Sequence, residues 1–75
     1  MPDTNDERAI ARRIAANVRR ARVARGWTQQ KLAEECELNI RSIQKIEGAE
    51  RSVLAATLVR IRAALKCSWE ELLGR

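Results

Sequence analysis

A group of hydrogen-bonding side chains lies between residues 40 and 45 of the chain. Ile43 and Ile46 are three residues apart, a spacing that puts both on one face of a helix. The opposite face carries four polar side chains that can bond to base edges and phosphates: Arg41, Ser42, Gln44 and Lys45. A helix with one apolar face and one polar, positive face predicts contact with nucleic acid rather than a catalytic site.

Two short helices and a tight turn are expected to position this polar face. Thr28 is a cap for the first of them. Its apolar positions follow at helical spacing: Leu32, Ala33 and Cys36. Asn39 caps the second helix, which is expected to run to about Glu47. Residues 28–47 together predict a helix-turn-helix, in which the second helix lies in the major groove of DNA.

A longer helix is expected before this pair. Thr4 and Glu7 form the capping-box pattern T-x-x-E, so the helix should start near Asn5. Its apolar stripe recurs every four residues: Ile10, Ile14 and Val18. Gly26 is placed to end this helix, and Trp27 to make the apolar contact that accompanies such an end.

Two more helices are expected after residues 48–51, which we interpret as a linker. The first of them has four apolar positions at helical spacing: Leu54, Leu58, Ile61 and Leu65. Ser68 and Glu71 form a second capping box, which opens a short helix through Leu73. The sequence thus predicts an all-α chain that forms a single domain over residues 1–75, with residues 1–5 as a short N-terminal arm.

One arginine is expected to face the core. Arg22 lies four residues after Val18, on the same helical face. A lone buried charge is costly, so a buried arginine needs a partner. Glu47 is the acid at the end of the polar helix. We predict an Arg22–Glu47 ion pair that locks the first helix to the third, and the alternative is an Arg22 side chain that reaches solvent.

The charge of the chain favours a polyanionic partner. The 75 residues carry a net charge of +5, and the pI is about 10.2. Seven arginines and no acid lie between Arg8 and Arg25, which fits either a DNA-binding surface or a solvated helix surface. Charged residues are 33% of the chain and no apolar run approaches the length of about 20 residues that spans a bilayer, so we expect no membrane association.

Several classes of site are not expected. The chain has no histidine or tyrosine, and its acid pairs at 34–35 and 70–71 are adjacent, so their side chains diverge on a helix. Cys36 and Cys67 are far apart and form no CxxC, and no glycine-rich loop occurs. We therefore expect no enzyme activity, cofactor, metal or small-molecule substrate. The acidic N-terminus is unlike a secretory signal and the thiols fit a reducing compartment, which predicts a cytoplasmic, nucleoid-associated protein.

Several motifs together indicate a known family. NVRRARVARGWTQ is a basic helix that ends in glycine, followed by an apolar residue, Thr and Gln. Further matching positions are Leu32, Ala33, Ile43, Ile46 and Glu47. These features resemble the phage repressor and Cro type of helix-turn-helix, the xenobiotic-response-element (XRE) family of bacterial regulators, and ATLVRIRAALKCSWEELL resembles its last two helices. The resemblance covers Ile14 to Leu73 and implies a compact five-helix, lambda-repressor-like domain that regulates transcription by binding specific double-stranded DNA.

Three positions depart from the family pattern. Glu37 stands where a turn glycine is usual, Gly48 directly follows Glu47 where Glu-x-Gly is frequent, and Val53 replaces a common proline. Glu37 is expected either to adopt a left-handed backbone, which costs about 1 kcal/mol, or to give the turn another shape. Residues 51–53, Arg-Ser-Val, resemble the restriction–modification controller proteins among the small members of the family.

The resemblance also implies which side chains contact DNA. The expected base-reading residues are Ile40, Arg41, Ser42, Gln44 and Lys45. The expected phosphate-binding residues are Gln29, Lys31, Arg51, Arg19 and Arg25. Lys31 lies in the first turn of its helix and opposes the helix dipole, which a nearby phosphate would explain. An ordinary surface lysine is the alternative interpretation of Lys31.

A two-fold dimer is the arrangement that the resemblance implies, with half-sites about 34 Å apart. Its surface is expected in the C-terminal region, about residues 65–73, where four apolar side chains lie: Leu65, Trp69, Leu72 and Leu73. Alternatively, Trp69 covers the core of its own monomer. The expected partners are double-stranded DNA, a second copy of the chain and, as a further candidate, RNA polymerase. The competing interpretation is an antitoxin or another protein-interaction module of the same fold.

Overall fold

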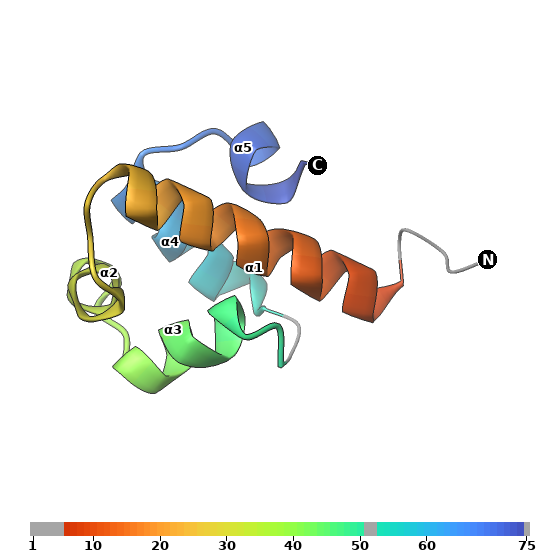
Figure 1. The fold of residues 1–75 in the computed structure, drawn as a ribbon, viewed down its shortest axis with the longest axis horizontal. Coiled ribbons are helices and arrows are strands. Elements are labelled where there is room, and N and C mark those ends of the chain that lie inside the picture. The colour runs from red at the N-terminus through yellow and green to blue at the C-terminus, as the bar shows by residue number, and fades with distance from the viewer. Residues whose placement is uncertain (1–5, 51–52, 75) are drawn as a thin grey trace.

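Helices account for most of the chain. The computed structural model describes residues 6–50 and 53–74. These residues form five helices and no strand, in the order α1 (Glu7–Ala24), α2 (Gln29–Cys36), α3 (Ile40–Glu47), α4 (Ala55–Leu65) and α5 (Trp69–Leu73) (Figure 1). The predicted all-α fold class is confirmed. No helix in the described part of the chain is long and apolar enough to cross a membrane.

Polar side chains set where four of the helices begin. Each of these caps accepts a hydrogen bond from a backbone N–H in the first turn: Asp6, Thr28, Asn39 and Ser68. Ser68 also forms the predicted capping box with Glu71. The cap of α1 differs from the prediction, because Asp6 bonds to the Ala9 N–H at 2.8 Å and α1 begins at Glu7. The predicted cap, Thr4, lies outside the described residues.

Left-handed residues follow the first four helices. These residues are Gly26, Glu37, Ala49 and Lys66, with φ between 52° and 70°. In each case the N–H of the next residue bonds back to a carbonyl five residues earlier: Trp27 to Arg22 at 3.1 Å, Leu38 to Ala33 at 2.9 Å, Glu50 to Lys45 at 3.1 Å and Cys67 to Arg62 at 3.4 Å. This is the Schellman ending, which satisfies carbonyl groups that a helix end leaves free.

The unusual residues of the sequence keep the backbone that glycine would adopt. Glu37 has φ 57° and ψ 43°, so the turn between α2 and α3 is left-handed without a glycine. At the end of α3, Ala49 has φ 56° whereas Gly48 has φ −84°. Ala49 therefore occupies the glycine position of the Glu-x-Gly pattern. The departures change the residue, at a cost of about 1 kcal/mol each, and leave the backbone conformation that glycine favours.

The core lies where the five helices meet. α1 packs against α3, α4 and α5, and α2 packs against α3 and α4. Each helix contributes one of the largest fully buried side chains: Val18, Leu32, Ile43, Ile61 and Leu72. Cys36 and Cys67 are buried free thiols, and burial raises the pKa of Cys36 to about 11. Both cysteines therefore serve as small interior residues.

Polar side chains of α1 hold the end of α5. Asn17 is 3% exposed, and its Nδ2 donates to the carbonyl oxygens of Leu72 at 2.9 Å and Gly74 at 2.6 Å. Arg13 Nε donates to the Leu73 carbonyl at 2.8 Å. A helix of five residues is too short to be stable by itself in water. These bonds, with the burial of Leu72, fix α5 on α1.

Candidate nucleic-acid interface

The outer face of α3 carries the polar side chains that the sequence predicts there. Ile43 and Ile46 are 0% and 8% exposed and form the inner face. Three outer side chains are exposed and have no side-chain hydrogen bond or ion pair with a described residue: Arg41, Gln44 and Lys45. Ile40 and Ser42 are half-buried. The outer face therefore offers unpaired donors and acceptors, which is what reading base edges in a groove requires.

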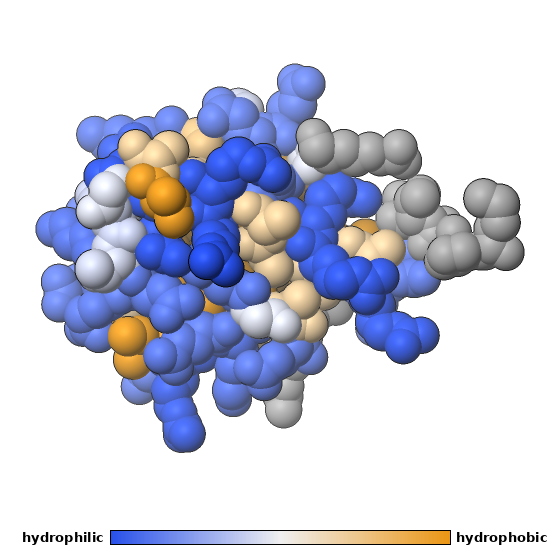
Figure 2. Space-filling view, viewed as in Figure 1, coloured by the Kyte–Doolittle hydropathy of each residue, from blue (hydrophilic) through white to orange (hydrophobic). Residues whose placement is uncertain are grey.

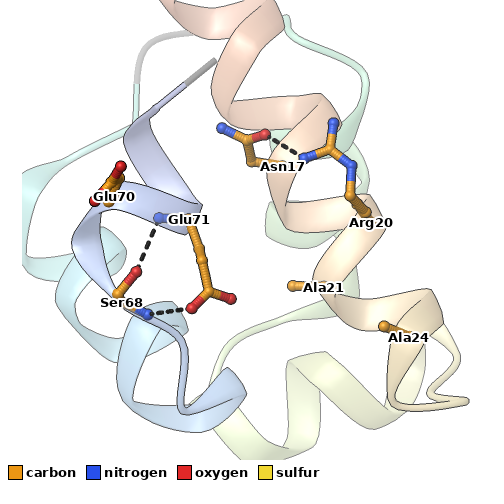
Figure 3. Close-up of a pocket in the computed structure, with 7 residues that line it drawn as sticks. All are labelled: Asn17, Arg20, Ala21, Ala24, Ser68, Glu70 and Glu71. Carbon is orange, nitrogen blue, oxygen red and sulfur yellow. Dashed lines mark hydrogen bonds between the residues drawn. The ribbon is translucent and has the colours of Figure 1, made fainter.

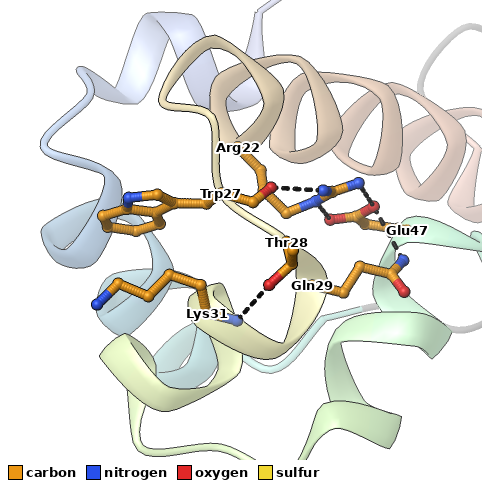
Figure 4. A network of polar contacts seen from close by, with 6 residues as sticks. All are labelled: Arg22, Trp27, Thr28, Gln29, Lys31 and Glu47. Atoms are coloured by element: carbon orange, nitrogen blue, oxygen red, sulfur yellow. Dashed lines mark hydrogen bonds and ion pairs between the residues drawn. The ribbon is translucent and has the colours of Figure 1, made fainter.

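A shielded ion pair fixes α3 against α1 (Figure 4). Arg22 Nε and Nη2 donate to the two carboxylate oxygens of Glu47, at 2.7 Å and 3.0 Å. The two side chains are only 13% and 5% exposed. Arg22 Nη1 also donates to the Trp27 carbonyl at 2.8 Å. The ion pair that the sequence predicts is therefore present, in the two-pronged geometry that favours Arg over Lys.

Gln29, the first residue of α2, joins this network. Its Nε2 donates to Glu47 Oε1 at 3.2 Å, and Figure 4 shows its amide oxygen pointing away from Glu47. The amide nitrogen carries two N–H groups, so one remains for a DNA phosphate. Nothing in the sequence pattern signals the contact between Gln29 and Glu47, which lie 18 residues apart.

Two residues that were expected at phosphates lie beside Trp27. Lys31 Nζ lies 6.0 Å from the centre of the Trp27 ring and 3.4 Å from Glu35 Oε2. The Arg25 guanidinium lies 5.2 Å from the same ring, and its Nε donates to the Leu65 carbonyl at 2.8 Å. Figure 4 shows that Lys31 and Gln29 extend in opposite directions. Cation–π and carbonyl contacts account for the positions of both cations without DNA, so phosphate binding by Lys31 and Arg25 stays a prediction.

The other two phosphate candidates are Arg19 and Arg51. Arg19 is exposed on α1 and has no hydrogen bond or ion pair with a described residue. Arg51 lies outside the described residues. Arg19 therefore keeps its assignment as a proposal.

The expected dimer surface needs correction. Leu65 and Leu72 are 2% and 0% exposed, because the apolar stripes of α4 and α5 are used by the core of the monomer. Trp69 is 41% exposed, with the Arg62 guanidinium 5.0 Å from the centre of its ring. Leu73 is half-buried and packs against the core. Of the four expected residues, Trp69 alone retains a large exposed apolar surface.

Two exposed apolar residues lie near α4, and the sequence analysis wrongly placed one of them, Leu54, on the apolar stripe of this helix. Leu54 is 75% exposed and Val59 is 49% exposed. A signal was available, because α4 reads AATLVRIRAAL and has apolar residues on all sides, which is unusual for a helix with a solvated face. On the face drawn in Figure 2, by contrast, strongly apolar atoms occur only as small separate spots on a hydrophilic surface.

A hollow of about 590 Å³ lies between α1 and α5 (Figure 3). Its lining residues are Asn17, Arg20, Ala21, Ala24, Ser68, Glu70 and Glu71. Arg20 Nη1 donates to Asn17 Oδ1 at 2.8 Å across its wall. The hollow faces α5 rather than α3 and carries two carboxylates, so it does not belong to a surface for DNA. No group of three or more metal-ligating side chains occurs among the described residues.

Comparison with known proteins identifies the class of this fold. The helix-turn-helix family model HTH_3 matches residues 18–72. The chain therefore belongs to this XRE-type helix-turn-helix family, which places it with DNA-binding regulators rather than with enzymes.

A curated sequence and a solved structure are each similar to nearly the whole chain. A Neisseria hypothetical transcription factor, from Neisseria meningitidis serogroup B, is 32% identical over 73 residues, which are 97% of this chain and 66% of the relative. The crystal structure of hypothetical transcription factor NHTF from Neisseria superposes with a TM-score of 0.82 at 27% identity, and covers 97% of this chain and 84% of that one. The arrangement of the helices thus matches a solved structure.

Proposed function

We propose that the protein regulates transcription by binding specific sequences of double-stranded DNA. The outer face of α3, with its unpaired polar side chains, is the observation that carries this proposal. Arg41 and Lys45 donate to guanine O6 and N7, and Gln44 pairs with adenine or a phosphate. Ile40 packs against a thymine methyl group at the edge of the face, and Ser42 contacts a base or the backbone.

Phosphates beside the groove are bound by a second set of residues. Gln29 uses its remaining N–H, aided by the free backbone N–H groups at the start of α2. Arg19 and Arg51 contribute further phosphate contacts, Arg51 from outside the described residues. These contacts fix the register of α3 and leave the reading of sequence to its outer face.

The protein acts as a homodimer on a palindromic operator in this proposal. An eight-residue helix gives few base contacts by itself, and a two-fold dimer places two of them about 34 Å apart. Trp69 and Val59, which remain exposed, supply the centre of the dimer surface, with Leu73 at its edge. Sedimentation at micromolar concentration tests this: Trp69→Ala should shift dimer to monomer, and a wild-type chain that stays monomeric with and without DNA would exclude it.

Selection of bound duplexes from a random pool tests sequence-specific binding. We expect recovery of a palindrome whose half-sites are about 10 base pairs apart. Arg41→Ala should relax the preference at one position of each half-site and cost about 1–3 kcal/mol. Lys31→Ala is the matched control, because its cation lies beside Trp27 and its loss should leave the base preference unchanged. A pool without any enriched sequence would contradict the proposal.

Two narrower roles are separated by the same experiment. A restriction–modification controller, suggested by residues 51–53, predicts that the selected operator recurs beside the gene for this chain and a neighbouring nuclease gene. Retention of RNA polymerase on that operator would indicate activation. The competing role, an antitoxin or other protein-interaction module, predicts a tightly bound protein partner and no enriched duplex.

A further inference from the structure

The seven arginines of residues 8–25 fall into two groups. Four of them have a hydrogen bond inside the protein: Arg13 to the Leu73 carbonyl, Arg20 to Asn17, Arg22 to Glu47 and Arg25 to the Leu65 carbonyl. Arg13 and Arg20 are directed to the α5 side of α1. These four therefore have a structural role that explains their presence without a ligand.

The other three arginines are Arg8, Arg12 and Arg19. All three are exposed and have no hydrogen bond or ion pair with a described residue. Arg12 follows Arg8 by four residues and Arg19 follows Arg12 by seven, so they form one stripe along the helix. Three exposed arginines in one line either keep the helix surface hydrated or bind a polyanion, and their place on the molecule separates the two.

This stripe borders the side of α1 that packs on α3. Arg22, three residues after Arg19, bonds to Glu47 of α3. Ala15 lies three residues after Arg12 and four before Arg19, and it is 5% exposed. The three arginines thus run beside the buried interface, on the flank opposite the bonds from Arg13 and Asn17 to the end of α5.

We propose that Arg8 and Arg12, in line with Arg19, bind the phosphate backbone of the duplex beyond the groove that α3 reads. This inference rests on the proposed function and extends its contact surface along α1. Figure 1 shows the N-terminal half of α1 reaching past the end of α3. α1 has 18 residues, a length of about 27 Å, and α3 has 8, a length of about 12 Å. The difference of about 15 Å equals the rise of about four base pairs, which is the most that α1 can add along the backbone.

A DNA backbone fits this stripe better than a lipid surface does. A helix that lies on a membrane inserts an apolar face beside its basic face. The apolar face of α1 is buried in the core through Ile14 and Val18, which are 6% and 0% exposed. Glu7 is the sole acid of α1, so little negative charge on this helix opposes a polyanion.

The salt dependence of binding tests the proposal. Each lost phosphate contact reduces the magnitude of the slope of log K against log salt by about 0.9. One substitution removes two contacts from a two-fold dimer and so reduces the magnitude of its slope by about 1.8. We expect this change for Arg12→Gln, and about twice as much for the Arg8→Gln, Arg12→Gln double variant. Arg12→Lys keeps the charge and should retain the slope. Arg20→Gln is the control, with the same loss of charge on the α5 side of the same helix.

Two probes keep this test separate from the proposed function. One is the duplex selected from the random pool, and the other is a mixed-sequence duplex of the same length. Equal slope changes for Arg12→Gln and Arg20→Gln would overturn the proposal, because net charge alone would then account for the effect. An unchanged slope for the double variant, with base preference still altered by Arg41→Ala, would overturn this inference and leave the proposed function standing. Failure of the wild-type chain to prefer any sequence would refute the proposed function. In that case, the salt slopes of the arginine variants on the mixed-sequence duplex would still show whether the stripe binds phosphates.

Discussion

Removing one member of the Arg22–Glu47 pair should destabilise the domain by about 3–5 kcal/mol. Glu47→Ala takes away three hydrogen bonds, two from Arg22 and one from Gln29. It leaves the guanidinium, 13% exposed, with the Trp27 carbonyl as its remaining partner among the described residues. Arg22→Ala leaves the carboxylate, 5% exposed, with Gln29. A domain of 75 residues has a total stability of about 4–11 kcal/mol, so each change removes a large part of it.

The double variant isolates the energy of the pair. When both side chains are alanine, no uncompensated charge remains near the core, so the loss should be smaller than the sum of the single losses by about 2–3 kcal/mol. Lys31 and Glu35 provide the matched control, since they form an ion pair at 3.4 Å with side chains 48% and 45% exposed. Their coupling should stay below about 0.5 kcal/mol because water screens the pair.

Urea unfolding followed by far-ultraviolet circular dichroism measures both cycles. Glu47→Gln, which keeps the shape and one acceptor, extends the series if an alanine variant is too unstable to give a folded baseline. Additive losses for Arg22 and Glu47, within about 0.3–0.5 kcal/mol, would refute the reasoning. So would a coupling no larger than that of Lys31 and Glu35, because the argument depends on shielding from water.

Three further predictions concern the backbone, a thiol and α5. Ala49→Gly should stabilise the domain by about 0.5–1 kcal/mol and raise its melting temperature. Gly26→Ala, at φ +70°, should destabilise the domain by a similar free energy and lower its melting temperature. Burial raises the pKa of Cys36 from 9.0 to about 11, so the folded chain holds the thiol proton more tightly than the unfolded chain. The free energy of unfolding should therefore fall between about pH 9 and pH 11. In urea titrations, Cys36→Ala should flatten this fall. Asn17→Ala frees two carbonyls at the end of α5 and should speed hydrogen exchange there before it affects α2 or α3; equal exchange throughout would argue against a local role.

The elements could be predicted because their signals are local. Short windows of sequence contain the caps at Thr28, Asn39 and Ser68. They also contain the apolar stripe of α1, which recurs every four residues, and the structure has helices at all these places. The Arg22–Glu47 pair is a long-range contact, yet it followed from a simple rule. A buried cation needs an acid, and the end of α3 offered one.

What could not be predicted depends on which surfaces meet. Apolar periodicity shows that Leu65 and Leu72 are buried, but it does not say whether the same chain or a second copy buries them. Likewise, charge in a first helical turn does not reveal that an aromatic ring lies 6.0 Å from Lys31. The end of α3 is closed by the bond from the Glu50 N–H to the Lys45 carbonyl, which makes Ala49, rather than Gly48, the left-handed residue. The side-chain types at these positions do not determine which N–H forms this bond.

α3 is held at both ends by contacts that do not involve its outer face. At its beginning, the left-handed Glu37 turns the chain, and the Leu38 N–H bonds to the Ala33 carbonyl at 2.9 Å while Leu38 packs against the core. At its end, Glu47 is fixed by Arg22. Because these two ends and the buried side chains of Ile43 and Ile46 hold the helix, substitutions on the outer face can change the sequence that is read and leave the position of the helix intact. A substitution at either end would instead displace every base contact at once, so the two ends set the geometry of reading and the outer face sets its specificity.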